Sequence, residues 1–272
     1  MADLYDVIQI HFTAGAVVPG TGQTILVNVP LSILMSLFVD FYECNEAPAV
    51  SIMYDKSDRV LDAGAGIGYI TSLIADRAEF VVGVEGIGLL AEIAVGNLSL
   101  NNRLNAIIVN NALGLDDKPV TFYERHLVYA SSTGPSHDSV MNETIIDSIN
   151  ANTLIAQYNL NALHFDLEGT EADLLDGIDL TPIRKVFLET HPHIYGSDGI
   201  RRIILRLRDH GLEPFLLGNP HGNAFPWQSC TIGFTRAELI PALRERIQLV
   251  GIYFWTQIEE IGEKEIKLGA WR

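Results

Sequence analysis

The chain has 272 residues, 48% of them apolar, which is enough to bury a large hydrophobic core in one sizeable domain. It carries 34 acidic against 18 basic side chains, a formal net charge of −16, so we expect it to repel phosphate backbones and to have no nucleic acid partner. Its two cysteines are far apart in sequence, which excludes a disulfide framework and a zinc-ligand spacing.

Residues 1–50 are predicted to form an N-terminal extension, or lid, that packs on the rest of the chain. The first ten residues lack a basic region followed by an apolar core, so we expect no secretory signal and a cytoplasmic location. The apolar run 25–39 is too short for a membrane span and is interrupted by Asn28 and Pro30. We therefore expect a helix that begins near Pro30, and a single globular unit over residues 51–272.

Apolar runs alternate with helical patterns from residue 59 onwards. The runs predict strands at 59–64, 80–85, 106–111, 162–169, 185–191 and 213–218, with shorter extended segments at 120–124, 144–149, 229–235 and 252–258. Helical spacing is found at 68–77, 89–101, 154–159, 171–177, 198–210 and 236–246. Because parallel neighbours need a crossover, this order predicts an α/β fold, a doubly wound, mostly parallel, Rossmann-like sheet.

The segment "VLDAGAGIGY", residues 60–69, lies between the first predicted strand and its helix. Gly64, Gly66 and Gly68 alternate there, and glycine allows positive φ and bare backbone against which a ligand can lie. Their G-x-G-x-G spacing differs from the G-x-G-x-x-G of dinucleotide sites. Asp62 before them disfavours a phosphate and suits a cationic ligand such as S-adenosylmethionine, whereas Glu85 suits the ribose of either cofactor.

Polar residues end several of the predicted strands. In doubly wound sheets, ligands bind beyond the carboxyl ends of the strands, near the point where the strand order reverses. We therefore expect one edge of the sheet to present Asp62, Glu85, Asn111, Asp166, Glu168 and His191.

The sequence resembles the FkbM-type methyltransferases, class I enzymes that depend on S-adenosylmethionine. The resemblance covers about residues 41–192 and is carried by "FYECNEAPAV", "VLDAGAGIGYITSLIA", "VVGVEG", "NLSLNNRLNAIIVNNALG", "LHFDLEGTEADLLDG" and "VFLETHP". The most distinctive element is D-x-E-G-x-E, residues 166–171, whereas the family's usual proline after Glu85 is replaced by Gly86. The resemblance implies a methyltransferase domain that methylates a hydroxyl on a small or carbohydrate-like acceptor, and a contact of Glu43 with the methionine end of the cofactor.

Methylation of a hydroxyl requires that its proton leave to a base. Asp166 is the first candidate because it ends a strand facing the ligand edge, and Glu168 and His191 are further candidates. Glu171 has two interpretations of similar weight. It is either a further candidate for the base or a cap of the short helix that follows. Asn111, at the end of the third strand, is a candidate for an adenine contact.

A catalytic metal is weighed separately, because Asp166, Glu168, His191 and His193 could converge on one ion. No tight ligand signature is present, so we expect no metal. Two alternative functions stay open, a nicotinamide-dependent oxidoreductase, which the glycine spacing disfavours, and a cofactor-binding protein without catalysis. The acceptor and the oligomeric state are left open by the sequence.

Overall fold

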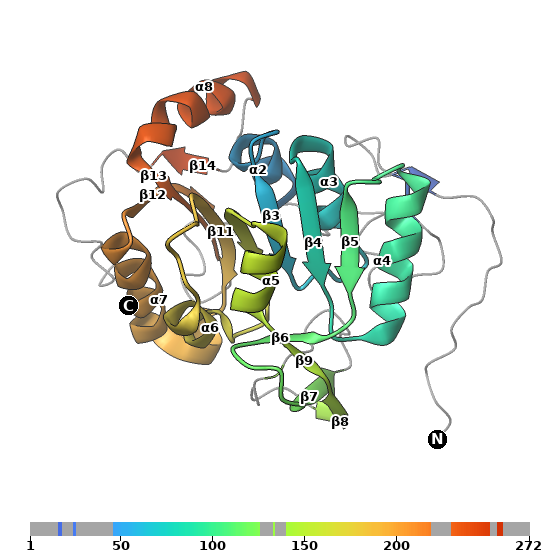
Figure 1. The fold of residues 1–272 in the computed structure, drawn as a ribbon. Helices are drawn as coiled ribbons and strands as arrows, with labels where there is room; N and C mark the ends of the chain where they lie inside the picture. Colours follow the sequence, from blue (N-terminus) through green and yellow to red (C-terminus); the bar gives the residue numbers. More distant parts are fainter. Residues whose placement is uncertain are drawn as a thin grey trace.

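The structure is a computed structural model that describes residues 16–17, 24–25, 46–125, 133, 140–218, 230–250 and 255–257. Its centre is an eight-stranded sheet covered by helices on both faces (Figure 1). In spatial order the strands are β5 (Ala106–Val109), β4 (Phe80–Val84), β3 (Arg59–Ala63), β10 (Ala162–Phe165), β11 (Lys185–Thr190), β13 (Cys230–Arg236), β12 (Leu212–Gly218) and β14 (Trp255–Gln257).

Five neighbouring strands, from β5 to β11, run parallel. Strand β13 is antiparallel to both β11 and β12, and β14 is antiparallel to β12. The helices are α2 (Glu46–Met53), α3 (Tyr69–Arg77), α4 (Gly88–Leu100), α5 (Ala151–Tyr158), α6 (Glu171–Gly177), α7 (Pro192–Asp209), the short η3 (Ala237–Leu239) and α8 (Ile240–Val250). The predicted doubly wound, mostly parallel sheet is confirmed.

Alternate residues of the strands feed two separate hydrophobic cores, as the period of two in a strand requires. In β3, Val60 packs in the core formed with α2, α3, α4 and α8, whereas Leu61 packs in the core formed with α5, α6 and α7. Strand β10 repeats the pattern with Ala162 and Leu163. Both faces of the sheet are therefore buried, which explains why its strands read as nearly continuous apolar runs.

Several details differ from the sequence predictions. Helix α2 and the short strand β6 (Ala112–Gly114) were not predicted, and β10 ends at Phe165 instead of continuing to residue 169. Helix α7 begins at Pro192, because proline suits the first turn, and it is interrupted at Gly196, where φ is +66°. The predicted helix near Pro30 lies outside the described residues.

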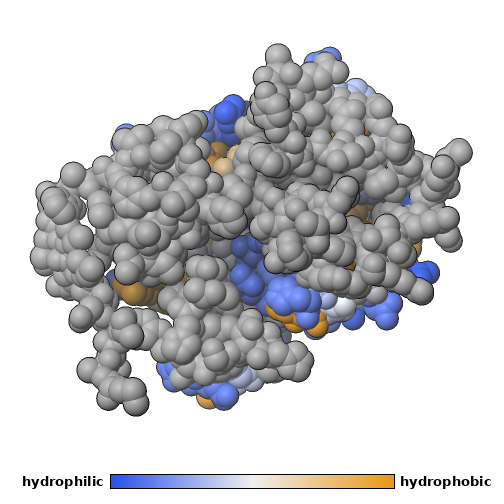
Figure 2. Space-filling model, turned by 180° about the vertical axis from the view of Figure 1, so that it is seen from behind, coloured by the Kyte–Doolittle hydropathy of each residue, from blue (hydrophilic) through white to orange (hydrophobic). Residues whose placement is uncertain are grey.

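Small strand pairs lie outside the main sheet. They are β1 (Ala16–Val17) with β2 (Thr24–Ile25), β6 with β9 (Ser148–Asn150), and the hairpin of β7 (Val120–Arg125) with β8 (Val140–Ile146). Where described residues reach the surface in Figure 2, hydrophilic residues predominate, with small apolar areas among them. No helix among the described residues combines the length and the apolar character that a membrane crossing requires.

The order of the strands reverses between β3 and β10. From β3 the chain proceeds outward through β4 to β5, and it then returns to place β10 on the other side of β3. At such a switch point the loops after the two central strands diverge and leave room for a ligand at their carboxyl ends. The loop after β3 contains the three glycines, and the residue after β10 is Asp166. The topology therefore brings the two main sequence motifs together.

Candidate active site

The loop after β3 has the backbone conformation that its glycines predict. The φ angles of Gly64, Gly66 and Gly68 are +88°, +52° and +75°. A Cβ atom on Gly64 would lie 1.7 Å from the carbonyl oxygen of Asp166, and one on Gly68 would lie 2.8 Å from the Cβ of Ala94. Glycine is therefore required here both for positive φ and for the close approach of neighbouring backbone.

Neighbouring elements hold this loop in place. The backbone N–H groups of Gly64 and Ala65 both donate to the carbonyl oxygen of Val84, at 3.0 Å each. From α4, the buried Asn97 donates its side-chain N–H to the carbonyl oxygen of Ile67 at 2.7 Å. The glycine loop is therefore anchored by β4 and by α4.

The carboxylate of Asp62 is buried beneath the loop, which corrects the expectation that it faces the edge of the sheet. One carboxylate oxygen lies 2.9 Å from Nδ1 of His164, and the other accepts a hydrogen bond from the hydroxyl of Thr71. The ring of His164 stacks on Phe187, with 5.4 Å between the centroids. Asp62 therefore ties β3 to β10 and α3, because its side chain is only 1% exposed and engaged on both oxygens.

Glu85 follows β4 and points its carboxylate at the glycine loop. It accepts hydrogen bonds from the backbone N–H groups of Gly66, at 2.8 Å, and of Ile87, at 2.7 Å. Burial raises the pKa of Glu85 to about 7, because the loss of hydration outweighs these two bonds. Asn110 donates its side-chain N–H to the backbone carbonyl oxygen of Glu85, at 2.8 Å. Asn111 is half-buried next to it.

The D-x-E-G-x-E segment forms a tight turn between β10 and α6. Glu168 and Gly169 both have positive φ, +54° and +109°, and a Cβ atom on Gly169 would lie 2.7 Å from the side chain of Ile194. Glu171 is completely buried, and its Oε1 accepts from the backbone N–H groups of Leu167, at 3.0 Å, and Gly169, at 3.2 Å. Glu171 therefore stabilises the turn before its helix, a role that neither reading of the sequence contained.

His191 lies at the centre of the acidic residues. Its Nδ1 is 3.0 Å from Oε1 of Glu171, and its Nε2 is 3.2 Å from Oε2 of Glu168 and 3.7 Å from Oδ1 of Asp166. Burial by itself lowers the pKa of His191, but the charges of Glu171, Glu168 and Glu189 and the hydrogen bond to Glu171 raise it well above its usual value. These contacts favour the protonated ring, which makes His191 a weaker candidate for the base than Asp166.

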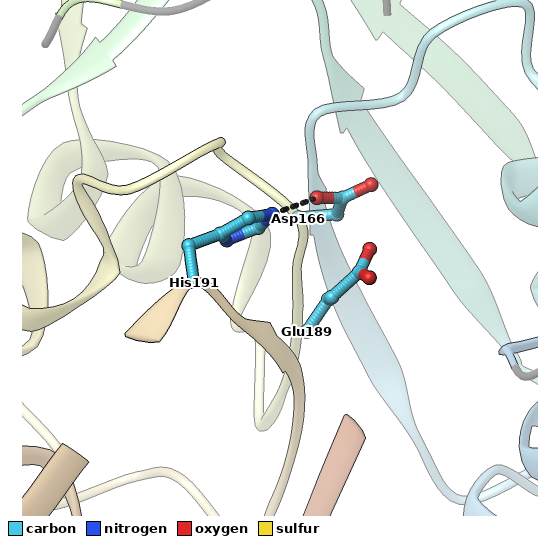
Figure 3. Close-up of side chains that lie close together, drawn as sticks. All are labelled: Asp166, Glu189 and His191. Atoms are coloured by element: carbon cyan, nitrogen blue, oxygen red, sulfur yellow. Dashed lines mark ion pairs between the residues drawn. The ribbon is translucent and has the colours of Figure 1, made fainter. Parts of the chain in front are cut away.

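Glu189 belongs to the same group, although the sequence analysis did not select it. Figure 3 shows the carboxylate of Glu189 beside the carboxylate of Asp166 and the ring of His191, at the ends of β10 and β11. Asp166, Glu189 and His191 each offer one ligand atom, and these atoms lie within 4.8 Å of one another. The spacing E-x-H in a strand, which places Glu189 and His191 on the same side, is the signal that would have revealed it.

Two further candidates lie apart from this group. His193 is exposed, and its ring meets that of His191 edge-on, with 5.8 Å between the centroids. Glu43 lies outside the described residues. Of the residues predicted for the ligand edge, the structure therefore brings Asp166, Glu168 and His191 into direct contact, with Glu85 and the glycine loop next to them along the sheet.

No family model matches the chain. Over 61 residues, 22% of its length, the chain is 51% identical to 23S rRNA (uracil(1939)-C(5))-methyltransferase RlmD of Vibrio campbellii, of which the match covers 14%. Over 80 residues, 28% of its length, it is 36% identical to protein-L-isoaspartate O-methyltransferase 1 of Archaeoglobus fulgidus, of which the match covers 37%. The chain thus spans well under two thirds of these curated relatives.

Among solved structures, the chain is similar to M. jannaschii TYW2 in complex with AdoMet. The similarity covers 71% of this chain and 76% of that chain, with 12% sequence identity and a TM-score of 0.41. In the main sheet of this chain, β13 lies between β11 and β12 and is antiparallel to both. This topology is the Rossmann-like fold of the class I S-adenosylmethionine-dependent methyltransferases.

Proposed function

We propose that the chain is an S-adenosylmethionine-dependent methyltransferase that methylates a hydroxyl group on a small or carbohydrate-like molecule. The observation that carries this proposal is the bare glycine loop, which lies beside the buried carboxylate of Glu85 at the switch point of the sheet. The short matches to proteins named as methyltransferases support methyl transfer. The FkbM-type assignment rests on the resemblance of segments within residues 41–192, of which D-x-E-G-x-E is the most distinctive, and is part of the proposal.

The residues around the loop fit the donor. Gly64, Gly66 and Gly68 leave backbone exposed to a ligand, and the carboxylate of Glu85 is placed to accept from ribose hydroxyls once it is released from the N–H of Gly66. Asp62, the next-to-last residue of β3 before the loop, fixes the start of α3 through the hydroxyl of Thr71. When bound, S-adenosylmethionine supplies a methyl group activated by a sulfonium. We further assign Asn111 to the adenine and Glu43 to the methionine end.

The chain's own residues supply the base that takes the proton from the hydroxyl to be methylated. Asp166 has a partly exposed carboxylate, and its backbone packs against Gly64, so we assign it as the base that takes the hydroxyl proton as the new C–O bond forms and the C–S bond of the donor breaks. Nε2 of His191 lies next to this carboxylate and helps to hold its position. Glu168 contacts the same nitrogen and holds the ring of His191. We assign residues 51–272 to the methyltransferase domain, together with α2, which begins at Glu46 and packs in its core; most of the rest of the predicted lid lies outside the described residues.

The acceptor class follows from charge. A net charge of −16 opposes the gathering of polyanions, so the proposal favours a small hydroxylated acceptor over RNA. The relative named for 23S rRNA makes RNA the second candidate. One assay distinguishes the two acceptor classes: a labelled methyl group is offered to a library of hydroxylated compounds and to total RNA, and the label appears on the true acceptor.

A calorimetric titration tests the proposed function. The full chain is expected to bind one S-adenosylhomocysteine and to show no heat with NAD or NADP. Binding of a nicotinamide cofactor in place of S-adenosylhomocysteine would favour the oxidoreductase. Binding of S-adenosylhomocysteine without methyl transfer to any acceptor in the library or in RNA would favour the non-catalytic alternative.

Replacing Asp166 with asparagine is expected to lower kcat by about 10²–10⁴-fold, because the variant keeps the shape of the side chain and loses the base. Its affinity for S-adenosylhomocysteine is expected to stay within threefold of wild type. Methyl transfer is measured with an acceptor found in the library. The matched control is Asp173→Asn, at an exposed position of α6, which is expected to leave kcat unchanged. Equal kcat in the two variants would remove Asp166 from the role of base.

The affinity for S-adenosylhomocysteine is expected to rise about tenfold from pH 6 to pH 8, because only ionised Glu85, with a pKa of about 7, accepts from both ribose hydroxyls. In the free protein the pH dependence of stability has the opposite sign to that of ligand affinity. A carboxyl group whose folded pKa is raised stabilises the fold below its unfolded pKa of about 4.5, and this stabilisation is lost as the pH rises towards 7. Titrations of wild type and Glu85→Gln at both pH values test this, since the variant is expected to bind more weakly and to lose the pH dependence. A retained dependence would show that another group titrates.

A further inference from the structure

The ends of β10 and β11 bring two carboxylates and one imidazole to the same point (Figure 3). The register pairs Phe165 with Leu188, so the next residues along the two parallel strands, Asp166 and Glu189, lie side by side. His191 follows two residues after Glu189 and faces the same side. The convergence therefore follows from the register of β10 and β11, with Asp166 and His191 placed directly after the ends of these strands.

The distances suit ligands that share an ion. Nε2 of His191 is 3.7 Å from Oδ1 of Asp166, which is too long for a hydrogen bond. Two ligand atoms at about 2.1 Å from one ion lie roughly 3–3.6 Å apart at octahedral or tetrahedral angles. The three candidate ligand atoms lie within 4.8 Å of one another, so a shift of about 1 Å or less by their side chains brings them to such a geometry.

The imidazole is oriented as a metal ligand is. Nδ1 of His191 is held by Oε1 of Glu171 at 3.0 Å, and Glu171 is held in turn by the backbone N–H groups of Leu167 and Gly169. A histidine ligand usually donates its other ring N–H to a carboxylate, which selects the tautomer and aims the free nitrogen at the metal. Here the second nitrogen, Nε2, faces Oε2 of Glu168, at 3.2 Å, and Oδ1 of Asp166, at 3.7 Å.

The charges at this point also favour a cation. Asp166, Glu168, Glu171 and Glu189 surround a single imidazole, and all five side chains are buried or half-buried. An imidazolium balances only one of the four carboxylates, and like charges repel strongly where water is scarce. The backbone of Glu189 pairs with β13, and its half-buried carboxylate adds a negative charge near the ring of His191. A divalent ion in place of the proton on Nε2 would balance this excess.

We infer that Asp166, Glu189 and His191 bind one divalent transition-metal ion, with Mn²⁺ as the best match. Two carboxylates and one imidazole suit Mn²⁺, whereas Mg²⁺ is usually bound through oxygen ligands alone. Glu168, whose Oε2 is 3.2 Å from Nε2 of His191, supplies a further oxygen next to the site. This inference replaces the expectation from sequence that no metal is bound.

The site adjoins the glycine loop, because Asp166 contacts Gly64 through its backbone. This role rests on the proposed function: the ion would bind the oxygen of the acceptor hydroxyl there and lower the pKa of that hydroxyl. Oδ1 of Asp166 would be the ligand, and its second oxygen would remain for the proton. Metal binding itself does not depend on the methyl donor.

Titration of the full chain with Mn²⁺, after removal of metals with EDTA and in the absence of any methyl donor, tests the site. Free Mn²⁺ is followed by electron paramagnetic resonance, and one ion per chain is expected. Glu189→Gln is expected to weaken Mn²⁺ binding at least tenfold. The matched control is Glu238→Gln, at an exposed position of η3, which is expected to bind as wild type does.

Electron spin-echo spectroscopy of the bound Mn²⁺ gives a measurement that needs no variant. Modulation from a coordinated imidazole nitrogen is expected, and it is expected to persist in Glu238→Gln. Absence of Mn²⁺ binding at millimolar concentration, equal affinities of the two variants, or bound Mn²⁺ without nitrogen modulation would overturn the inference. Because the calorimetric titration with S-adenosylhomocysteine is a separate measurement, failure of the metal site and failure of the proposed function are distinguishable.

Discussion

Gly64→Ala is expected to lower the affinity for S-adenosylhomocysteine at least 100-fold and to reduce the free energy of unfolding by roughly 2–5 kcal/mol. Two causes add. The residue has a φ of +88°, which disfavours any side chain, and its new Cβ would lie 1.7 Å from the backbone oxygen of Asp166. Because that oxygen belongs to the main chain, the loop itself must move away from β10. Calorimetry and urea denaturation measure the two effects.

The matched control for this variant is Gly211→Ala. Gly211 also has positive φ, +73°, but it follows the end of α7, and its Cβ would meet only the end of the Arg236 side chain, at 3.0 Å. We expect a loss of about 1–2 kcal/mol of stability and unchanged ligand affinity. If Gly64→Ala bound S-adenosylhomocysteine within threefold of wild type, the glycine loop would not be the binding site.

Glu171→Ala is expected to reduce the free energy of unfolding by roughly 3–5 kcal/mol, as expected when one partner of a buried ion pair is removed. The change leaves the N–H groups of Leu167 and Gly169 and the Nδ1 of His191 without their common acceptor, in a place that water does not reach. Urea denaturation at pH 7 measures the effect. The turn that holds Glu168 is expected to loosen at the same time.

Glu171→Gln separates the contribution of charge from that of hydrogen bonding. Its amide oxygen can still accept from the two backbone N–H groups, so we expect a smaller loss than in Glu171→Ala. The exposed Asp173→Asn on the same helix serves as the control and is expected to change stability by less than about 0.5 kcal/mol. A loss in Glu171→Ala no larger than in this control would show that the turn does not depend on the carboxylate.

Local patterns in the sequence were sufficient to predict most of the sheet. The strands β3, β4, β5, β10, β11, β12 and β13 and the helices α3, α4, α6 and α7 all coincide with predicted segments, apart from differences at their ends. The glycine loop was predicted for the same reason, because positive φ is a property of the residue itself. Helix α2 was missed, since its segment "EAPAVSIM" shows little helical periodicity.

The sequence by itself determined the elements, their alternation and the bare loop after β3, because apolar period and glycine act within a few residues. Only the tertiary structure decided which acidic side chains are structural and which lie together at the candidate site. It buried Asp62 against His164, placed Glu171 under His191, and brought Glu189 beside Asp166. These contacts join residues 20 or more positions apart and depend on the register of β3, β10 and β11. A one-dimensional pattern does not contain that register, since many acids follow strands and few of them meet across a sheet.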